Sequence, residues 1–177
     1  MKSKACLFLA TLLLVVLTVL PAAGEQSTDE YTVGSFSYRI PSTWRTDDAE
    51  DGYYHYAGDP ADAGKGYVYA ALQTFEGVTI RSETEARFFL ANVANGMIES
   101  TEGESKVLST YDIEMGGLYA SLVRMDLDYY GITYPASSVM ILDGGEIFII
   151  MYLDTDHTTE EQLKIFSDIV NSIEISE

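Results

Sequence analysis

Residues 137–153, SSVMILDGGEIFIIMYL, form the stretch that decides the fold. Two runs, residues 139–142 and 147–153, carry apolar side chains at both odd and even positions, which is typical of strands buried on both faces. Gly144 and Gly145 lie between the runs and predict a tight turn, because glycine adopts a positive φ without steric cost. The stretch therefore predicts a central hairpin in a sheet that is covered on both sides.

Two capped helices are predicted, one before and one after this hairpin. Ser82 and Glu85 have the spacing of a capping box, in which each side chain bonds the other residue's backbone amide. Thr158 and Glu161 repeat the same spacing. After each box, apolar residues recur at helical spacing on one side only, as in a helix that covers a sheet. The two stripes comprise Ala86, Phe89, Leu90, Val93, Ala94 and Met97 in the first helix, and Leu163, Phe166, Val170 and Ile173 in the second.

The predicted fold class is α/β of the α+β type, with a predominantly antiparallel central sheet of about six to eight strands. Helices cover both faces of this sheet, which makes an α/β/α sandwich. The acidic stretch 47–51 is predicted as a solvated loop. Between Leu122 and Val123 the apolar residues switch from even to odd positions, which predicts a β-bulge or a change of cover. Further strands are predicted within residues 31–40, 52–57, 66–75, 103–115 and 117–129.

Residues 1–24 have the features of a secretory signal peptide. Lys2 and Lys4 supply the positive start, residues 5–20 the apolar segment, and the small residues up to Gly24 a cleavage site. An uncleaved membrane anchor is the alternative, but the apolar segment is shorter than the about 20 residues that a spanning helix needs. The sequence therefore predicts a secreted, extracytoplasmic protein.

The remaining chain is predicted to be a short polar lead, residues 25–30, followed by a single domain, residues 31–177. Cys6 is the only cysteine, and it lies inside the signal segment. The mature domain therefore has no disulfide and no thiolate metal site. A chain of this length can bury a sufficient core without a disulfide.

The charge of the protein is strongly negative. Ten basic and 28 acidic residues give a net charge of −18, and removal of Lys2 and Lys4 with the signal lowers it to −20. Such a charge repels nucleic acids and anionic lipid headgroups, so neither is predicted as a partner. Calcium, cationic peptides and basic protein patches are compatible with it. The alternative is that the charge serves solubility alone.

The sequence offers no recognisable catalytic centre, so no catalytic residue and no cofactor are predicted. His55 and His157 lie in different segments, and a transition-metal site needs three or four converging ligands. The nucleophile motifs of serine hydrolases and the zinc-binding His-Glu-x-x-His motif are missing. Asp154 and Asp156 are the candidate ligands for calcium, although an acidic helix start is the simpler reading of both.

Tyrosines are the strongest candidates for a binding surface. Tyr53, Tyr54, Tyr56, Tyr67 and Tyr69 fall on two strands that a short acidic loop joins. If the hairpin register brings them opposite one another, they form a ladder whose rings and hydroxyls could line a ligand groove. Packing of these rings beneath the helices is the alternative.

Three motifs give the chain a resemblance to the PsbP-like fold family: FSYRIPSTW at residues 36–44, GEIFIIMY at 145–152 and IFSDIVNSI at 165–173. The family includes a photosystem oxygen-evolution subunit, a nuclear Ran-binding factor and many secreted bacterial proteins. The resemblance implies an antiparallel sheet between helices, and binding or adaptor roles more than catalysis. The chain lacks the basic docking surface of the photosystem subunit and the lipobox cysteine of many bacterial relatives.

Together these observations predict a secreted, non-enzymatic domain that binds a protein, a peptide or a small ligand, with the tyrosines as its surface. A calcium-responsive or other cation-responsive binding protein is the first alternative. A hydrolase with an unrecognised site is the second.

Overall fold

The predicted hairpin lies at the centre of the main sheet in the computed structural model, which describes residues 27–48, 54–58, 66–101, 103–129, 131–155 and 157–176. Strands β8 (Ile132–Asp143) and β9 (Glu146–Asp154) pair antiparallel around Gly144, whose φ is +58°. Residues 136–142 and 147–150 are all buried, so the prediction of a hairpin buried on both faces is confirmed. The predicted signal segment lies outside the described residues.

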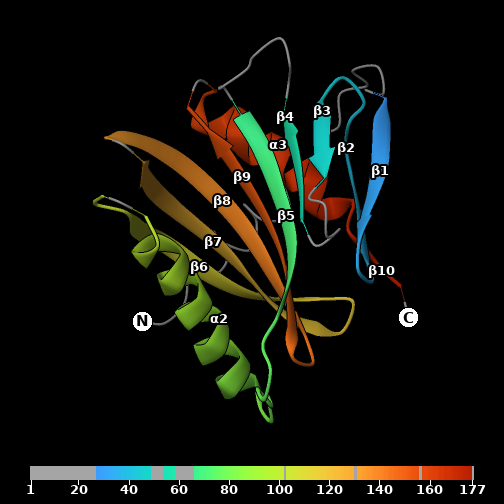
Figure 1. Ribbon diagram of the computed structural model, residues 1–177, viewed down its shortest axis with the longest axis vertical. Helices are drawn as coiled ribbons and strands as arrows, with labels where there is room; N and C mark the ends of the chain where they lie inside the picture. Colours follow the sequence, from blue (N-terminus) through green and yellow to red (C-terminus); the bar gives the residue numbers. More distant parts are fainter. Residues whose placement is uncertain are drawn as a thin grey trace, which may run out of the picture.

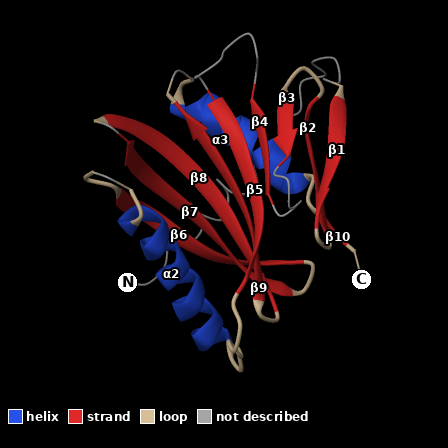
Figure 2. Ribbon diagram, in the orientation of Figure 1, coloured by secondary structure: helices blue, strands red, loops and turns tan. Residues whose placement is uncertain are grey.

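The described residues form two antiparallel sheets (Figures 1 and 2). The main sheet has seven strands in the order β3-β4-β5-β9-β8-β7-β6, and a smaller sheet has three in the order β1-β2-β10. The remaining strands of the main sheet are β3 (Arg45–Asp48), β4 (Tyr54–Gly58), β5 (Gly66–Thr74), β6 (Lys106–Met115) and β7 (Leu118–Tyr129). The small sheet comprises β1 (Thr28–Val33), β2 (Phe36–Pro41) and β10 (Glu174–Ile175).

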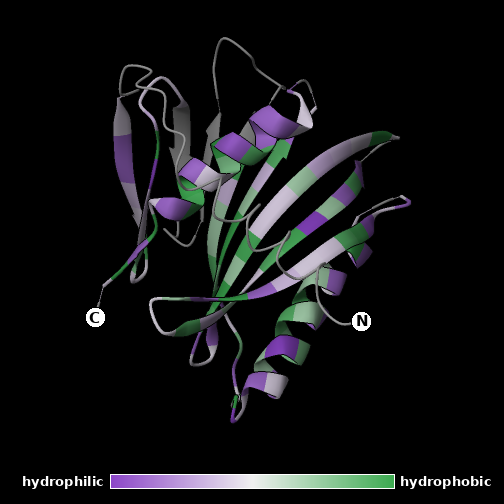
Figure 3. Cartoon of the chain, turned by 180° about the vertical axis from the view of Figure 1, so that it is seen from behind, coloured by the Kyte–Doolittle hydropathy of each residue, from purple (hydrophilic) through white to green (hydrophobic). Residues whose placement is uncertain are grey.

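Each face of the main sheet has its own hydrophobic cluster. On one face, called the α2 face here, helix α2 (Glu83–Glu99) packs its buried Ala86 and Leu90 with Met140 of β8. On the opposite face, the α3 face, helix α3 (Thr159–Asn171) and the small sheet pack on β8 and β9. The hydropathy colouring in Figure 3, seen from behind, shows the green apolar strands beneath α3.

The predicted α+β class with mostly antiparallel sheets is confirmed, but the layers differ from a simple sandwich. A small sheet shares the α3 face with the helix, and its third strand is only two residues long. Residues 47 and 48 were predicted in a loop, yet they belong to β3, an edge strand of the main sheet. Edge strands tolerate charged residues because one side of them faces solvent, which explains why their composition resembled a loop.

The switch of apolar positions in β7 is a change of cover. Ala120 packs into the cluster on the α3 face, whereas Val123 packs into the cluster on the α2 face. The register between β7 and β8 is continuous through this point. The irregularity lies instead in the neighbouring strand β6, between Val107 and Ser109.

Candidate functional site

Four of the five predicted tyrosine positions fall on one face of the β4–β5 hairpin. The register places Tyr56 opposite Tyr69, and Tyr54 opposite Ala71. Because side chains alternate along a strand, positions 54, 56, 67 and 69 share one face. Tyr53 lies outside the described residues. The backbone pairing that a tyrosine ladder requires is therefore present, and its role in binding stays a prediction.

These positions lie on the α2 face, toward the end of the sheet away from the helix. Tyr69 pairs with Met151 of β9, and both side chains are half-buried. Helix α2 packs on β6, β7 and β8, at the other end of the same face. Figure 1 shows α2 next to β6 and β7, with β4 and β5 beyond it. We call positions 54, 56, 67 and 69 together with Met151 the tyrosine face.

One acidic position lies next to the tyrosine face, in the edge strand β3. Asp47 of β3 lies opposite Tyr56, in one row with Tyr69 and Met151. Residues 49–51 of the predicted acidic loop lie outside the described residues.

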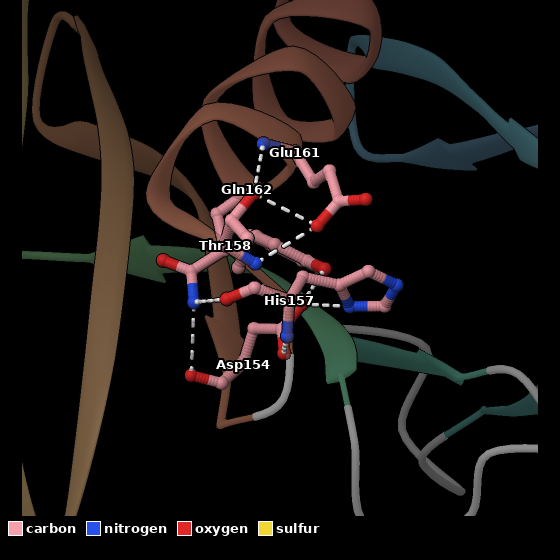
Figure 4. Close-up of polar contacts among 6 residues, drawn as sticks. Asp154, His157, Thr158, Glu161 and Gln162 are labelled. Carbon is pink, nitrogen blue, oxygen red and sulfur yellow. Dashed lines mark hydrogen bonds and ion pairs between the residues drawn. The ribbon is translucent and has the colours of Figure 1, made fainter.

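A second polar cluster lies at the junction of β9 and α3, on the α3 face (Figure 4). The side chain of Asp154 is fully buried, and the hydroxyl of Tyr152 donates a hydrogen bond to it. The backbone amide of His157 donates to Asp154 Oδ1 at 3.0 Å, and His157 Nδ1 lies 2.5 Å from Asp154 Oδ2. Burial, and then the bond to Asp154, raise the pKa of Tyr152 above its ordinary value.

The same cluster begins helix α3. The predicted capping box is present: Thr158 Oγ1 accepts from the amide of Glu161 at 3.4 Å, and Glu161 Oε2 accepts from the amide of Thr158 at 2.9 Å. These bonds to Thr158 lower the pKa of Glu161. Gln162 Nε2 donates to the backbone carbonyls of His157 at 3.0 Å and of Asp154 at 3.4 Å. Strand and helix are thus joined by polar contacts on both sides of the cap.

The geometry favours a structural role for this cluster. Both carboxylate oxygens of Asp154 already accept hydrogen bonds, and Asp156, the other candidate calcium ligand, lies outside the described residues. Within the described ranges, no group of three or more His, Cys, Asp or Glu side chains is arranged to hold a metal ion. The side chain of His157 is 35% exposed, and no serine, threonine or cysteine of the described chain is hydrogen-bonded to its ring.

Sequence reasoning treated Asp154 and His157 as parts of a helix start and did not find the bond from Tyr152. The signal for it is the spacing of Tyr152 and Asp154, which places both side chains on one face of a strand. An aspartate at the end of a buried strand, two residues after a tyrosine, could therefore have been predicted to accept its hydroxyl.

Comparison with known proteins identifies the fold and not a function. No protein-family model matches the chain, and no curated protein matches it. Among solved structures, the cyanobacterial PsbP protein (CyanoP) of Synechocystis is similar with a TM-score of 0.64 and 9% identity, over 90% of this chain and 99% of that one. LpqN of Mycobacterium tuberculosis, described as involved in cell envelope biogenesis, is similar with a TM-score of 0.55 and 16% identity, over 88% and 87% of the two chains.

A Pseudomonas aeruginosa protein of unknown function, described as a putative regulator, is a third similar structure. Its TM-score is 0.53 at 15% identity, over 79% of this chain and 91% of that one. The chain therefore has the PsbP-like fold, as the sequence motifs predicted. At these identities the similarity shows the fold alone, so the function has to be argued from the residues of this chain.

Proposed function

We propose that this protein is an extracytoplasmic, non-enzymatic binding domain that holds a cationic peptide segment of a partner protein on its tyrosine face. The observation that carries the proposal is the β4–β5 register, which gathers four tyrosine positions on the half of the α2 face away from the helix. Tyrosine suits such a surface because its ring gives rigid apolar contact area and its hydroxyl can hydrogen-bond.

The charge of the chain supports a cationic partner. A net charge of −18 attracts basic segments over long distances, and Asp47 brings negative charge into the same row as Tyr69. Lysine and arginine side chains also bind favourably to the faces of aromatic rings. An acidic partner would meet repulsion from both sources.

The proposed location outside the cytoplasm rests on the signal features of residues 1–24. The similarity to LpqN, described as involved in cell envelope biogenesis, supports the same location. In the described part of the chain, no helix has both the length and the apolar character for a membrane crossing.

A peptide titration tests the proposal. The probe is a fluorescent peptide of alternating lysine and leucine, compared by anisotropy with a peptide of alternating glutamate and leucine. Tyr69→Ala should weaken binding of the lysine peptide about 5- to 30-fold, as expected of an aromatic residue at a binding hot spot. Tyr119→Ala is the matched control, because Tyr119 is an exposed tyrosine on the α2 face at the opposite end of the sheet.

Two results would overturn the proposal. One is equal affinity for the lysine and glutamate peptides, which would remove the electrostatic basis. The other is an equal loss of affinity in the two tyrosine variants, which would place the peptide elsewhere. Thermal unfolding of both variants shows whether either substitution has disturbed the fold.

A further inference from the structure

Three polar residues form one row across the α3 face, on the side of the sheet opposite the tyrosine face. Ser109 of β6 lies opposite Arg124 of β7, and Arg124 lies opposite Ser137 of β8. Arg124 and Ser109 are half-buried, and Ser137 is only 8% exposed. We call these three residues the polar row.

The polar row is not satisfied within the described chain. None of its three side chains makes a hydrogen bond or an ion pair with another described residue. A buried hydroxyl without a partner costs about 1–3 kcal/mol, and buried polar groups are nearly always paired. The hydroxyl of Ser137 is therefore a buried donor that lacks an acceptor among the described residues. Arg124 lies opposite it in the register and carries a positive charge.

A β-bulge builds this row. Val107 pairs with Met125 and Ser109 pairs with Arg124, so Leu108 is the extra residue of the bulge. In a regular ladder Leu108 would lie opposite Arg124. The bulge leaves Leu108 exposed and places Ser109 opposite Arg124 instead. Bulges of this kind are common next to functional sites because they re-aim one side chain.

The neighbours of the polar row define what it can bind. Asp126, the nearest acidic residue along β7, forms an ion pair with Lys106 at 3.3 Å, so its charge is compensated. Tyr111 and Leu122 lie opposite each other in the adjacent row, and Tyr111 is 61% exposed. Helix α3 packs on β8 and β9, and in Figure 3 β6 and β7 extend beyond it. The row thus has an aromatic side chain on one flank.

We propose that the polar row binds the carboxylate of a small organic acid whose aromatic or aliphatic part lies on Tyr111. The planar guanidinium of Arg124 matches the two oxygens of a carboxylate, and the hydroxyls of Ser109 and Ser137 donate to the same oxygens. The net charge of the chain disfavours polyanions, so the ligand carries a single negative charge. This site lies on the face opposite the tyrosine face and is independent of the peptide-binding proposal.

The test uses 3-phenylpropionate as the probe and its uncharged amide as the matched compound. In two-dimensional NMR of the mature protein, the acid should give saturable shifts centred on the amides of the polar row. The amide should bind at least about tenfold more weakly, which corresponds to about 1.4 kcal/mol. Arg124→Gln should reduce affinity for the acid by a similar factor.

Arg39→Gln is the control variant, since Arg39 is an exposed arginine already paired with Glu30 at 3.1 Å. It should leave the affinity for the acid unchanged. Equal binding of acid and amide, equal loss in both arginine variants, or no saturable shift up to the solubility of the acid would each overturn the proposal. Tyr111→Ala should weaken the binding of phenylpropionate and leave the binding of acetate unchanged. This comparison separates the contribution of the aromatic contact from that of the charge.

Discussion

Asp154 is a fully buried carboxylate whose hydrogen bonds join the end of β9 to the start of α3. The backbone amide of His157 donates to one oxygen of this carboxylate. The hydroxyl of Tyr152 donates to the other oxygen, which also lies 2.5 Å from Nδ1 of His157. A buried carboxylate depends on its donors, because the cost of leaving it unsatisfied far exceeds the net gain of each bond. The junction is therefore most sensitive to loss of a donor.

Tyr152→Phe should lower the free energy of unfolding by about 1–3 kcal/mol, because it removes one donor and leaves the buried carboxylate in place. Urea unfolding at neutral pH measures the change. Tyr119→Phe is the control, and its effect should stay within about 0.5 kcal/mol because the ring is at the surface. A Tyr152→Phe protein as stable as the parent would contradict a role for this hydroxyl.

The hydrogen bond between Tyr152 and Asp154 should also make the free energy of unfolding depend on pH in the alkaline range. Burial and Asp154 raise the pKa of Tyr152 above its ordinary value of 10.0. A raised pKa in the folded state means that the stabilisation is complete below the unfolded pKa and is lost as the pH rises above it. The stability advantage of the parent over Tyr152→Phe should therefore shrink above about pH 10. An advantage that stays constant to higher pH would show that Tyr152 does not resist ionisation.

Glu161 should make the free energy of unfolding depend on pH in the acidic range. Its hydrogen bonds to Thr158 lower its pKa below the ordinary value of 4.5, so its contribution is present above that value and is lost as the pH falls through the folded pKa. Glu161→Gln keeps an acceptor for the cap and removes the charge. The stability difference from the parent should be steady at neutral pH and vanish in acid, as followed by urea unfolding across a pH series. Glu160→Gln removes a neighbouring exposed charge without the capping contact and should show no such loss.

The elements that depend on residues close in sequence could be predicted, whereas strand pairing between distant parts of the chain could not. The hairpin around Gly144 and the starts of the two helices depend on residues close in sequence, so their patterns are sufficient. The reciprocal capping box is complete only at Thr158 of α3, because in α2 the side chain of Glu85 accepts from the amide of Arg81 and not from that of Ser82. The small sheet was missed because β10 is two residues long and finds its partner β2 at the other end of the chain. No periodicity over two residues can indicate a strand, and only the folded chain brings β10 and β2 together.

The two candidate sites likewise differ in whether their residues are close together in the sequence. The tyrosine positions could be found from the sequence because β4 and β5 are neighbours along the chain and alternate regularly. The polar row could not be found, because it combines three strands and depends on the bulge at Leu108. A bulge shifts the register by one residue, and a register shift reverses which side chains face each side of the sheet.

Two deletions of equal length test the role of the bulge. Deletion of Leu108 removes the extra residue and keeps Ser109 opposite Arg124. Deletion of Thr110 also regularises the strand, but it places Leu108 opposite Arg124 and turns Ser109 to the α2 face. The first protein should retain phenylpropionate binding, and the second should lose about tenfold in affinity.

Urea unfolding provides the control for both deletions, since each protein must show the cooperative transition of the parent before its affinity is compared. Equal affinities in two folded deletion proteins would show that the residue opposite Arg124 does not matter. That result would remove Ser109 from the proposed site and leave Arg124 and Ser137.

At the scale of the whole molecule, the dominant property is charge. The net charge of −18 on the 177-residue chain becomes −20 without Lys2 and Lys4 of the signal segment. Such a charge favours expansion through self-repulsion, while it also draws cationic partners toward the surface. Both effects act through solvent and are screened by salt. They should therefore respond to ionic strength together, but in opposite directions.

Raising the NaCl concentration from about 0.01 M to 0.15 M shortens the screening length from about 30 Å to about 8 Å. The melting temperature of the mature protein should rise by a few degrees, because repulsion in the folded state is reduced, while its affinity for the lysine–leucine peptide should fall. Calorimetry and anisotropy measure the two responses. If peptide affinity did not fall, contact with the tyrosines alone would account for binding.

A calcium measurement tests the cation-responsive alternative. The melting temperature is measured in CaCl₂ and in NaCl at the same ionic strength. A higher melting temperature in CaCl₂ would favour that alternative, because a ligand that binds only the folded state stabilises it beyond the effect of screening.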